Sequence, residues 1–419
     1  MEELFVEGGR RLCGELTVQG SKNGVLPVLA ATILCGGACR IENCPRLRDV
    51  DASIAILRHL GCCTRWEDGA LLVDTTHMDK NEVPDALMRE MRSSVIFLGA
   101  ILARQGEAVL SYPGGCELGP RPIDIHLSAL RALGAEIAER GGTLRCTARH
   151  LTAAEIVLPL PSVGATENAI LAACGAEGTT VVYNAAREPE IQELQDFLNA
   201  MGAEVKGAGG SIVTVAGLRQ LHGGSHRVIA DRIVGATYLC ACAACGGEIR
   251  LNGADGFTLS TVSHALREAG CTVHDERGAV SLESGGALRG IRPVRTAPYP
   301  GFPTDAQPAL MAALLKSEGS TVFVENIFEN RYRHVDELAR MGAQIRVAGR
   351  VAVLSGVKTL HGAAVKCTDL RGGAALVLAG LQAEGETRVS LPEHIDRGYE
   401  RIERDLALLG ARIERRTVT

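Results

Sequence analysis

The sequence predicts an α/β protein made of two similar domains. Its 419 residues exceed what one hydrophobic core usually organises, so two domains of about 200 residues are the default. Apolar residues make up 46% and charged residues 22%, as in an ordinary soluble globular protein. The strongest observation is a recurring sequence motif, which predicts an amphipathic helix that ends at a glycine and is followed by a strand.

This motif begins with a leucine and has its glycine four residues later. Successive glycines are 73, 68, 68, 72 and 68 residues apart. They are Gly61, Gly134, Gly202, Gly270, Gly342 and Gly410. A second set, expected to stop another helix before a β-rich run, is Gly37, Gly106, Gly178, Gly247, Gly319 and Gly385. The chain therefore predicts six repeats of about 70 residues, longer than common solenoid units, with three repeats per domain.

A third position lies 14 or 15 residues before each glycine of the second set, where a strand should pass into a helix. The six residues there are Lys22, Arg92, Gly164, Arg232, Asp305 and Arg371. Free amide groups and the helix dipole favour anions at such helix starts. Four cations and one carboxylate predict a site for a phosphate-rich substrate with a base inside it. Ordinary surface capping is the alternative.

The run from Pro113 to Pro122 is predicted to be a loop, because it is rich in glycine and proline. Such shaped loops often carry function. We interpret Cys116 in this loop as a reactive thiol rather than a buried hydrophobe, and Arg121 as a group that tunes its pKa.

Two further motifs have simpler interpretations. Cys242-Ala-Ala-Cys245 imitates a redox or metal pair, but the same helix of other repeats has small apolar residues there, so packing is expected. The loop Gly20-Ser-Lys-Asn-Gly places Lys22 to bind a phosphate or carboxylate without being a P-loop. Asp305 is a candidate general base. A second ring of arginines recurs at Arg121, Arg187, Arg331 and Arg397.

Composition excludes several classes of function. A net charge of −5 and an aromatic content of 3% argue against nucleic-acid binding. We expect no signal peptide, because residues 1–20 alternate apolar and polar, and no membrane span, because the longest apolar run is nine residues. The 14 cysteines are expected to be reduced thiols of a cytoplasmic protein. Neither a metal site nor a cofactor is expected.

Taken together, several motifs resemble the UDP-N-acetylglucosamine 1-carboxyvinyltransferase family of enolpyruvyl transferases, over essentially the whole chain. They are Gly20-Ser-Lys-Asn, Pro113-Gly-Gly-Cys with Arg121-Pro, Pro161-Ser-Val-Gly-Ala-Thr, Ala185-Ala-Arg-Glu-Pro-Glu-Ile, Arg295-Thr-Ala-Pro with Phe302-Pro-Thr-Asp, and His394-Ile-Asp-Arg-Gly-Tyr-Glu-Arg. The resemblance implies a pair of inside-out α/β barrels with buried helices. It places one domain at 22–229, the other at 1–21 plus 230–419, and the active site in the cleft between them.

The resemblance also implies the reaction. Phosphoenolpyruvate donates its enolpyruvyl group to the 3′-hydroxyl of UDP-N-acetylglucosamine, phosphate leaves, and peptidoglycan synthesis begins. Cys116 would be the acid that protonates the methylene carbon, and it would be the target of fosfomycin. Asp305 would act as base on the 3′-hydroxyl, with Lys22 and Arg397 as further catalytic residues.

Substrate-binding residues follow from the same resemblance. Those expected to hold phosphoenolpyruvate are Lys22, Arg121 and Arg397. Those expected to line the site are Asn23, Arg92, Arg331 and Arg371. Those expected to meet the nucleotide sugar are Arg121, Pro122, Ile123, Asp124, Ile125, Ser162, Val163, Gly164, Asp305 and Ile327. Leu160 departs from the family, in which many members carry a basic residue at this position.

Two other functions remain open. The related 5-enolpyruvylshikimate-3-phosphate synthases share fold and donor, although they do without the Pro-Gly-Gly-Cys loop. A catalytically silent paralogue that binds the nucleotide sugar is the second alternative. The oligomeric state is not indicated by the sequence.

Overall fold

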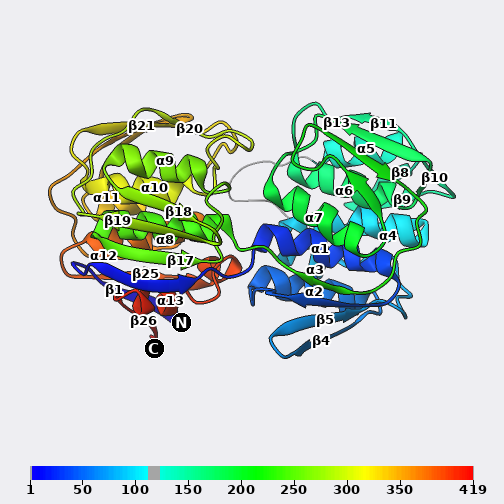
Figure 1. Cartoon of the computed structure of the whole chain (residues 1–419), viewed down its shortest axis with the longest axis horizontal. Coiled ribbons are helices and arrows are strands. Elements are labelled where there is room, and N and C mark those ends of the chain that lie inside the picture. Colours follow the sequence, from blue (N-terminus) through cyan, green and yellow to red (C-terminus); the bar gives the residue numbers. More distant parts are fainter. Residues whose placement is uncertain (1, 112–122, 419) are drawn as a thin grey trace. The chain divides into compact units, whose positions relative to one another are not determined.

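The computed structural model describes residues 2–111 and 123–418, apart from the side chain of Arg92. The predictions for Cys116, Arg121 and Pro122 therefore lie outside the described residues. The chain divides into two compact units (Figure 1). We call residues 20–111 and 123–229 the central unit, and residues 2–19 and 230–418 the terminal unit.

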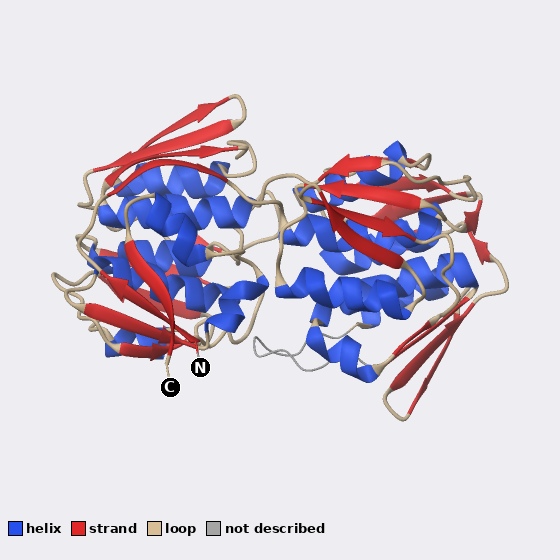
Figure 2. Cartoon of the chain, turned by 90° about the horizontal axis from the view of Figure 1, so that it is seen from below, coloured by secondary structure: helices blue, strands red, loops and turns tan. Residues whose placement is uncertain are grey.

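Three four-stranded sheets form the outer layer of the central unit (Figure 2). The first contains, in order, β16 (Ser225–Arg227), β3 (Ala38–Glu42), β5 (Ala70–Asp74) and β4 (Cys63–Glu67). The second contains β6 (Glu82–Val83), β7 (Glu107–Ser111), β9 (Thr143–Thr147) and β8 (Glu136–Arg140). The third contains β11 (Glu155–Val157), β13 (Thr179–Tyr183), β15 (Ile212–Ala216) and β14 (Glu204–Lys206). A short pair joins β10 (Leu151–Thr152) and β12 (Ala176–Glu177).

The terminal unit has three sheets of the same size. The first contains β18 (Thr272–Glu276), β19 (Ala279–Ser284), β17 (Gly247–Asn252) and β2 (Leu12–Thr17). The second contains β20 (Val294–Arg295), β21 (Ser320–Val324), β23 (Val351–Ser355) and β22 (Gln344–Ala348). The third contains β24 (Ala364–Lys366), β25 (Glu386–Ser390), β1 (Glu2–Glu7) and β26 (Arg412–Thr417), so the two ends of the chain pair.

One pairing pattern recurs in these sheets. In the second sheet of the central unit, β6 is parallel to β7, whereas β9 is antiparallel to both β7 and β8. The other two central sheets pair in the same way. So do the three sheets of the terminal unit.

Helices fill the inside of each unit, as Figure 2 shows. Those of the central unit are α1 (Lys22–Cys35), α2 (Arg48–His59), α3 (Asp85–Glu90), the 3-10 helix η1 (Arg92–Ile96), α4 (Phe97–Gln105), α5 (Asp124–Ala132), α6 (Val163–Ala173) and α7 (Pro189–Ala200). Those of the terminal unit are α8 (Arg232–Cys245), α9 (Ser260–Ala269), α10 (Gln307–Ala313), η2 (Leu314–Lys316), α11 (Val335–Arg340), α12 (Leu370–Gln382), η3 (Pro392–Arg397) and α13 (Ile402–Leu408).

The most buried helices are rich in small residues, which lets them pack closely at the centre of a unit. Helices α1, α4 and α6 contact one another in the central unit, and α8, α10 and α12 do so in the terminal unit. Both α6 and α12 are buried along nearly their whole length. Burial of this apolar surface is the main stabilising contribution to each core.

The first set of predicted glycines ends helices in the way expected. Gly61, Gly134, Gly202, Gly270, Gly342 and Gly410 all have φ between 92° and 113°. That region favours glycine, which has no Cβ to clash. A strand begins two residues after each of them, for example β8 after Gly134 and β26 after Gly410.

The second set needs a correction. Gly106 does cap α4 with φ 71°, but Gly36 rather than Gly37 caps α1, and Gly246 rather than Gly247 caps α8. Gly178, Gly319 and Gly385 follow their helices by several residues and immediately precede a strand. The shared position is the entry to the strand, because the helices of different repeats end at different points.

Candidate active site

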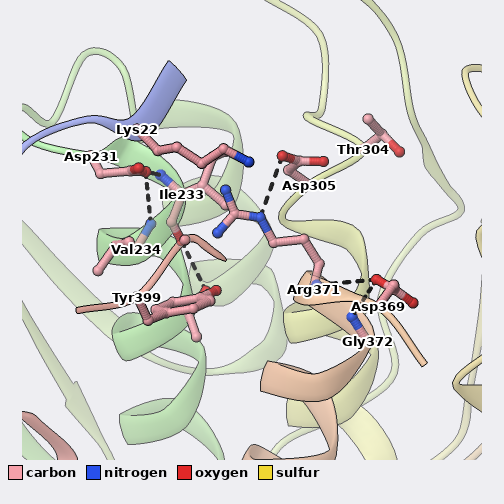
Figure 3. A network of polar contacts seen from close by, with 12 residues as sticks. Lys22, Asp231, Ile233, Val234, Thr304, Asp305, Asp369, Arg371, Gly372 and Tyr399 are labelled. Carbon is pink, nitrogen blue, oxygen red and sulfur yellow. Dashed lines mark hydrogen bonds and ion pairs between the residues drawn. The ribbon is translucent and has the colours of Figure 1, made fainter. Parts of the chain in front are cut away.

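A carboxylate held between two buried arginines forms the core of the candidate site in the terminal unit. Figure 3 shows this carboxylate, Asp305, bound to one of them, Arg371. Arg331 Nη2 donates to Asp305 Oδ1 at 2.8 Å, and Arg371 Nε donates to Asp305 Oδ2 at 3.3 Å. The arginine side chains are 1% and 3% exposed, whereas that of Asp305 is 27% exposed. Asp305 thus neutralises two desolvated guanidinium groups and still reaches solvent.

The start of α12 fixes Arg371. The Asp369 side chain caps this helix by accepting from the backbone amides of Arg371 and Gly372, at 3.1 and 2.9 Å. The Arg371 guanidinium lies 5.4 Å from the centre of the Tyr399 ring. Burial opposes the charged form, but the neighbouring Tyr399 and the Asp305 and Asp231 carboxylates raise the pKa of Arg371 above its usual value. Within the described part of the chain, Nη1 and Nη2 make no hydrogen bond of good geometry.

A second carboxylate, Glu325, organises the turn that carries Ile327. Glu325 is fully buried and accepts from the amides of Ile327 and Phe328, at 2.8 and 3.0 Å. Its other oxygen accepts from the Thr304 hydroxyl at 3.0 Å. The Thr304 carbonyl in turn accepts from Arg331 Nη2 at 2.8 Å. One network therefore positions Ile327, Arg331 and the residue that precedes Asp305.

His334 lies behind this cluster, at the start of α11. The side chain is fully buried, and neither ring nitrogen makes a hydrogen bond of good geometry within the described residues. Burial lowers the pKa of His334 to about 4, which the Asp369 carboxylate opposes and the Arg331 charge reinforces. His334 is therefore a neutral packing residue beside the arginines at physiological pH.

Lys22 is the first residue of α1 in the central unit. The Ser21 hydroxyl caps this helix by accepting from the Gly24 amide at 3.1 Å. Lys22 Nζ lies 2.8 Å from Asp49 Oδ2, and the two side chains are only 12% and 3% exposed. Asp49 comes from α2 and fixes the ammonium group at the helix start, where an anion is favoured.

The predicted turn Ser162-Val-Gly164 begins α6. Ser162 caps the helix, and a Cβ at Gly164 would lie 2.8 Å from His126 Cε1, so only glycine fits there. His126 lies on α5, which begins at Asp124, and its Nδ1 is 2.9 Å from Asn168 Nδ2. Asn168 also donates to the Val95 carbonyl and accepts from the Gly99 amide. This network fixes the start of α6 against α5 and α4.

Glu167 is a buried carboxyl group that lies near other acidic side chains. It is 5% exposed on α6, and burial raises its pKa to about 8, with further increases from Glu190 and Glu188. The group therefore holds a proton near neutral pH. No pattern in the sequence identified it.

Each predicted site residue that the structure describes can be placed within its own unit. In the terminal unit, the structure brings together Asp305, Arg331 and Arg371. Ile327 joins the same network through Glu325, and Arg397 ends η3. In the central unit, Lys22 and Asn23 open α1, Ile123 to Ile125 open α5, and Ser162 to Gly164 open α6. Arg92 opens η1, and its side chain is not described.

Several residues of the site were missed by sequence reasoning. They are Asp49, His126, Asn168, Thr304, Glu325 and His334. Most belong to types whose usual role is capping or surface exposure, so the residue alone carries no signal. The Lys22–Asp49 pair joins α1 to α2, and only tertiary structure brings these helices together.

Two buried arginines surround this partly exposed carboxylate, Arg371 near the start of α12 and Arg331 in the turn before α11, and such cationic groups are of the kind that binds anions in α/β enzymes. The comparisons with known proteins agree. Residues 6–406 match the family model of EPSP synthase (3-phosphoshikimate 1-carboxyvinyltransferase), and the chain belongs to this family. The resemblance inferred from the motifs is thereby confirmed.

Curated relatives match along the whole chain. The chain is 48% identical over 415 residues to "UDP-N-acetylglucosamine 1-carboxyvinyltransferase 2" of Caldanaerobacter subterraneus subsp. tengcongensis, covering 99% of this chain and 100% of the relative. It is 46% identical over 424 residues to "UDP-N-acetylglucosamine 1-carboxyvinyltransferase" of Novosphingobium aromaticivorans, covering 99% of both.

Solved structures show the same fold. The enolpyruvyl transferase NikO from Streptomyces tendae superposes with a TM-score of 0.86 at 26% identity, over 100% of this chain and 99% of that one. EPSP synthase from Acinetobacter baumannii superposes with a TM-score of 0.76 at 21% identity, over 99% and 100% of the two chains, and so supports the fold alone.

Two features are absent from the part of the chain that the structure describes. No helix there has both the length and the apolar character needed to cross a membrane. No group of three or more His, Cys, Asp or Glu side chains there is arranged to hold a metal ion.

Proposed function

We infer that this chain transfers the enolpyruvyl group of phosphoenolpyruvate to the 3′-hydroxyl of UDP-N-acetylglucosamine, with release of phosphate, at the start of peptidoglycan synthesis. The full-length similarity to transferases of that name supports the acceptor. The single structural observation that carries the inference is Asp305 held between Arg331 and Arg371. A carboxylate so placed suits removal of a hydroxyl proton beside an anionic donor.

We propose that the recurring sheets correspond to six repeats, three per unit, and that each unit is an inside-out α/β barrel. The shared pairing of six described sheets and the buried central helices support this architecture. We propose domains of 22–229 and of 1–21 plus 230–419, with the active site in the cleft between them. A cytoplasmic location follows from the substrates, because such highly charged molecules do not enter a bilayer unaided.

The proposed roles cover binding of both the donor, phosphoenolpyruvate, and the acceptor, the nucleotide sugar. Lys22, Arg121 and Arg397 hold the phosphate and carboxylate of phosphoenolpyruvate. The residues that line the site are Asn23, Arg92, Arg331 and Arg371. The residues that contact the nucleotide sugar are 121–125, Ser162 to Gly164, Asp305 and Ile327. No cofactor takes part in this proposal.

The proposed chemistry is an addition followed by an elimination. The Cys116 thiol gives its proton to the methylene carbon, which creates positive charge at the neighbouring carbon. The 3′-oxygen bonds to that carbon as Asp305 takes the hydroxyl proton. The carbon–oxygen bond to phosphate then breaks, and the methyl carbon returns one proton to the Cys116 thiolate as the double bond re-forms. Cationic residues around the leaving phosphate stabilise its charge.

Phosphate release tests this function. The chain is incubated with phosphoenolpyruvate alone, with UDP-N-acetylglucosamine added, and with shikimate 3-phosphate added. We expect release of phosphate only with the nucleotide sugar. Release with shikimate 3-phosphate would instead support the synthase alternative, and no release with either acceptor would support a silent paralogue.

A further inference from the structure

Arg397, which we propose to bind phosphoenolpyruvate, ends a short 3-10 helix that has little strength of its own. Helix η3 covers Pro392–Arg397, starts after Leu391 in a left-handed conformation with φ 59°, and stops at Gly398. Short 3-10 helices have poor hydrogen-bond geometry. Contacts from elsewhere in the fold must therefore hold the Arg397 backbone in place.

One contact acts just before Arg397. The guanidinium of Arg415, on the last strand β26, binds the Asp396 carboxylate with two hydrogen bonds, Nη2 to Oδ1 at 2.6 Å and Nη1 to Oδ2 at 2.9 Å. Glu403 and Glu2 also lie within ion-pair distance of Arg415, whose side chain is 13% exposed. Bidentate pairs of this kind fix geometry as well as charge.

A second contact acts just after Arg397. The Gln19 carboxamide donates from Nε2 to the Gly398 carbonyl at 3.2 Å, and its Oε1 accepts from the Glu400 amide at 2.9 Å. The Gln19 backbone carbonyl also accepts from the amide of Asp231, which caps α8. The Gln19 side chain therefore satisfies two backbone groups that flank Tyr399, and the Gln19 backbone links them to the start of α8.

A third contact is the packing of the segment around Arg397 against α12. A Cβ at Gly398 would lie 2.8 Å from Leu370 Cδ2, and a Cβ at Gly373 would lie 2.8 Å from Ile395 Cγ1. Gly398 and the Ile395 side chain, on the two sides of Arg397, thus pack directly on α12, the helix that carries Arg371. Tyr399, whose ring faces Arg371, is bound through its hydroxyl to Thr237 at 2.8 Å.

We propose that Gln19 and Arg415 are positioning residues for Arg397, and that they tune the binding of phosphoenolpyruvate by holding the backbone before and after it. This inference rests on the proposed function, because it assigns Arg397 to the donor. A purely structural role of the two residues would weaken binding of donor and acceptor alike, or only lower stability. A positioning role raises KM for phosphoenolpyruvate selectively.

The experiment measures KM for each substrate, kcat and Tm in the variants Gln19→Leu, Arg415→Lys, Arg415→Met and Arg397→Lys. We expect Gln19→Leu and Arg415→Met to raise KM for phosphoenolpyruvate about five- to thirtyfold. KM for UDP-N-acetylglucosamine is expected to change less than about twofold. Arg415→Lys keeps the charge without the bidentate geometry, so its effect should lie between wild type and Arg415→Met.

Two matched controls are available. Arg412→Lys alters another arginine of β26, whose Nη1 donates to both carboxylate oxygens of Glu7 on β1, away from η3. Gln195→Leu removes a glutamine that accepts from the Ala208 amide in the central unit. Neither control should change KM for phosphoenolpyruvate. If Arg415→Met does not fold, Arg415→Lys and Gln19→Leu still decide the question.

A double variant separates this inference from the proposed function. Gln19→Leu should add little to KM in an Arg397→Lys background, because it acts through Arg397. Fully additive effects, or unchanged KM in both Gln19→Leu and Arg415→Lys while Arg397→Lys raises it, would overturn the positioning role and leave the proposed function standing. An unchanged KM in Arg397→Lys would contradict the proposed role of Arg397 and this inference together.

Discussion

Arg331 Nη2 lies 2.8 Å from Asp305 Oδ1, and the Arg331 side chain is 1% exposed. The guanidinium cannot turn to solvent for another partner, and it is also bound to the Thr304 carbonyl. Because Arg371 approaches the other carboxylate oxygen, Asp305 compensates two buried charges at once. One residue therefore serves both the stability of the terminal unit and the proposed chemistry.

We predict that Asp305→Asn lowers kcat by about 10²- to 10⁴-fold, because an amide cannot accept the hydroxyl proton. The same change should lower the free energy of unfolding by about 1–3 kcal/mol, since both guanidinium groups lose their charged partner. Phosphate release and urea unfolding measure the two effects. Asp85→Asn is the matched control, because Asp85 forms an exposed pair with Arg89 at a helix surface. Turnover at the wild-type rate in Asp305→Asn would remove Asp305 as the base.

Because the pKa of Glu167 is raised, we predict that the folded protein loses stability as the pH rises. Burial raises its pKa to about 8 from 4.5, so the folded chain holds a proton that the unfolded chain has released. Stability from this group is complete below pH 4.5 and is lost as the pH rises through about 8. The total is at most about 5 kcal/mol.

The variant Glu167→Gln should flatten this pH dependence, because the amide stays neutral at every pH. Urea unfolding of wild type and variant at several pH values between 5 and 9 measures the difference. Glu177→Gln, which changes an exposed carboxylate of the same unit, should leave the profile unchanged. Parallel profiles for wild type and Glu167→Gln would show that Glu167 is ionised in the folded protein.

Because the pKa of His334 is lowered, we predict that this residue makes the folded protein lose stability as the pH falls. Burial lowers its pKa to about 4, so the unfolded chain binds a proton more readily. Stability from the neutral ring is complete above the ordinary pKa of about 6.5 and is lost as the pH falls through about 4.

We therefore expect His334→Phe to resist acid better than wild type between pH 6.5 and 4, since phenylalanine has no ring nitrogen that the unfolded chain can protonate. Unfolding midpoints across this range provide the measurement. His264→Phe serves as control, because His264 lies beside Arg292 at the surface. An unchanged acid transition in His334→Phe would assign the loss of stability to other groups.

Much of the local structure could be predicted from the sequence, since its causes are local. Gly134 and Gly410 each end a helix with positive φ, and a strand starts two residues later. Of the charged residues expected at helix starts, Lys22 and Arg232 are first residues and Arg371 is the second residue of its helix. Asp305 is the exception, because it lies in a turn two residues before α10. Periodicity and glycine chemistry are enough for such positions.

Partnerships across the chain could not be predicted. Nothing near Lys22 in sequence indicates Asp49, and nothing near Asp305 indicates that Arg331 and Arg371 are buried. The proton on Glu167 depends on burial and on neighbours from another helix. Such properties arise from tertiary packing, which a single sequence does not encode in any short pattern.

The cysteines give a final prediction, about reactivity. Cys13 and Cys63 are exposed, whereas Cys242 is buried and Cys245 is partly buried. Burial raises the pKa of Cys245 to about 12 and that of Cys242 further, so neither is a thiolate near neutral pH. The Cys242–Cys245 pair should therefore stay unlabelled by a thiol reagent until the protein unfolds.

This contrast isolates Cys116, which we predict from sequence to be reactive. The double variant Cys13→Ser/Cys63→Ser lacks the exposed thiols described in the structure, so one fast-reacting thiol should remain. Fosfomycin should block it, and adding Cys116→Ser should abolish both the fast labelling and turnover. Measured labelling kinetics by mass spectrometry identify the residue. If the double variant shows no fast thiol, or if Cys116→Ser keeps full turnover, Cys116 is not the acid, because a proton donor at the methylene carbon must be accessible to the substrate.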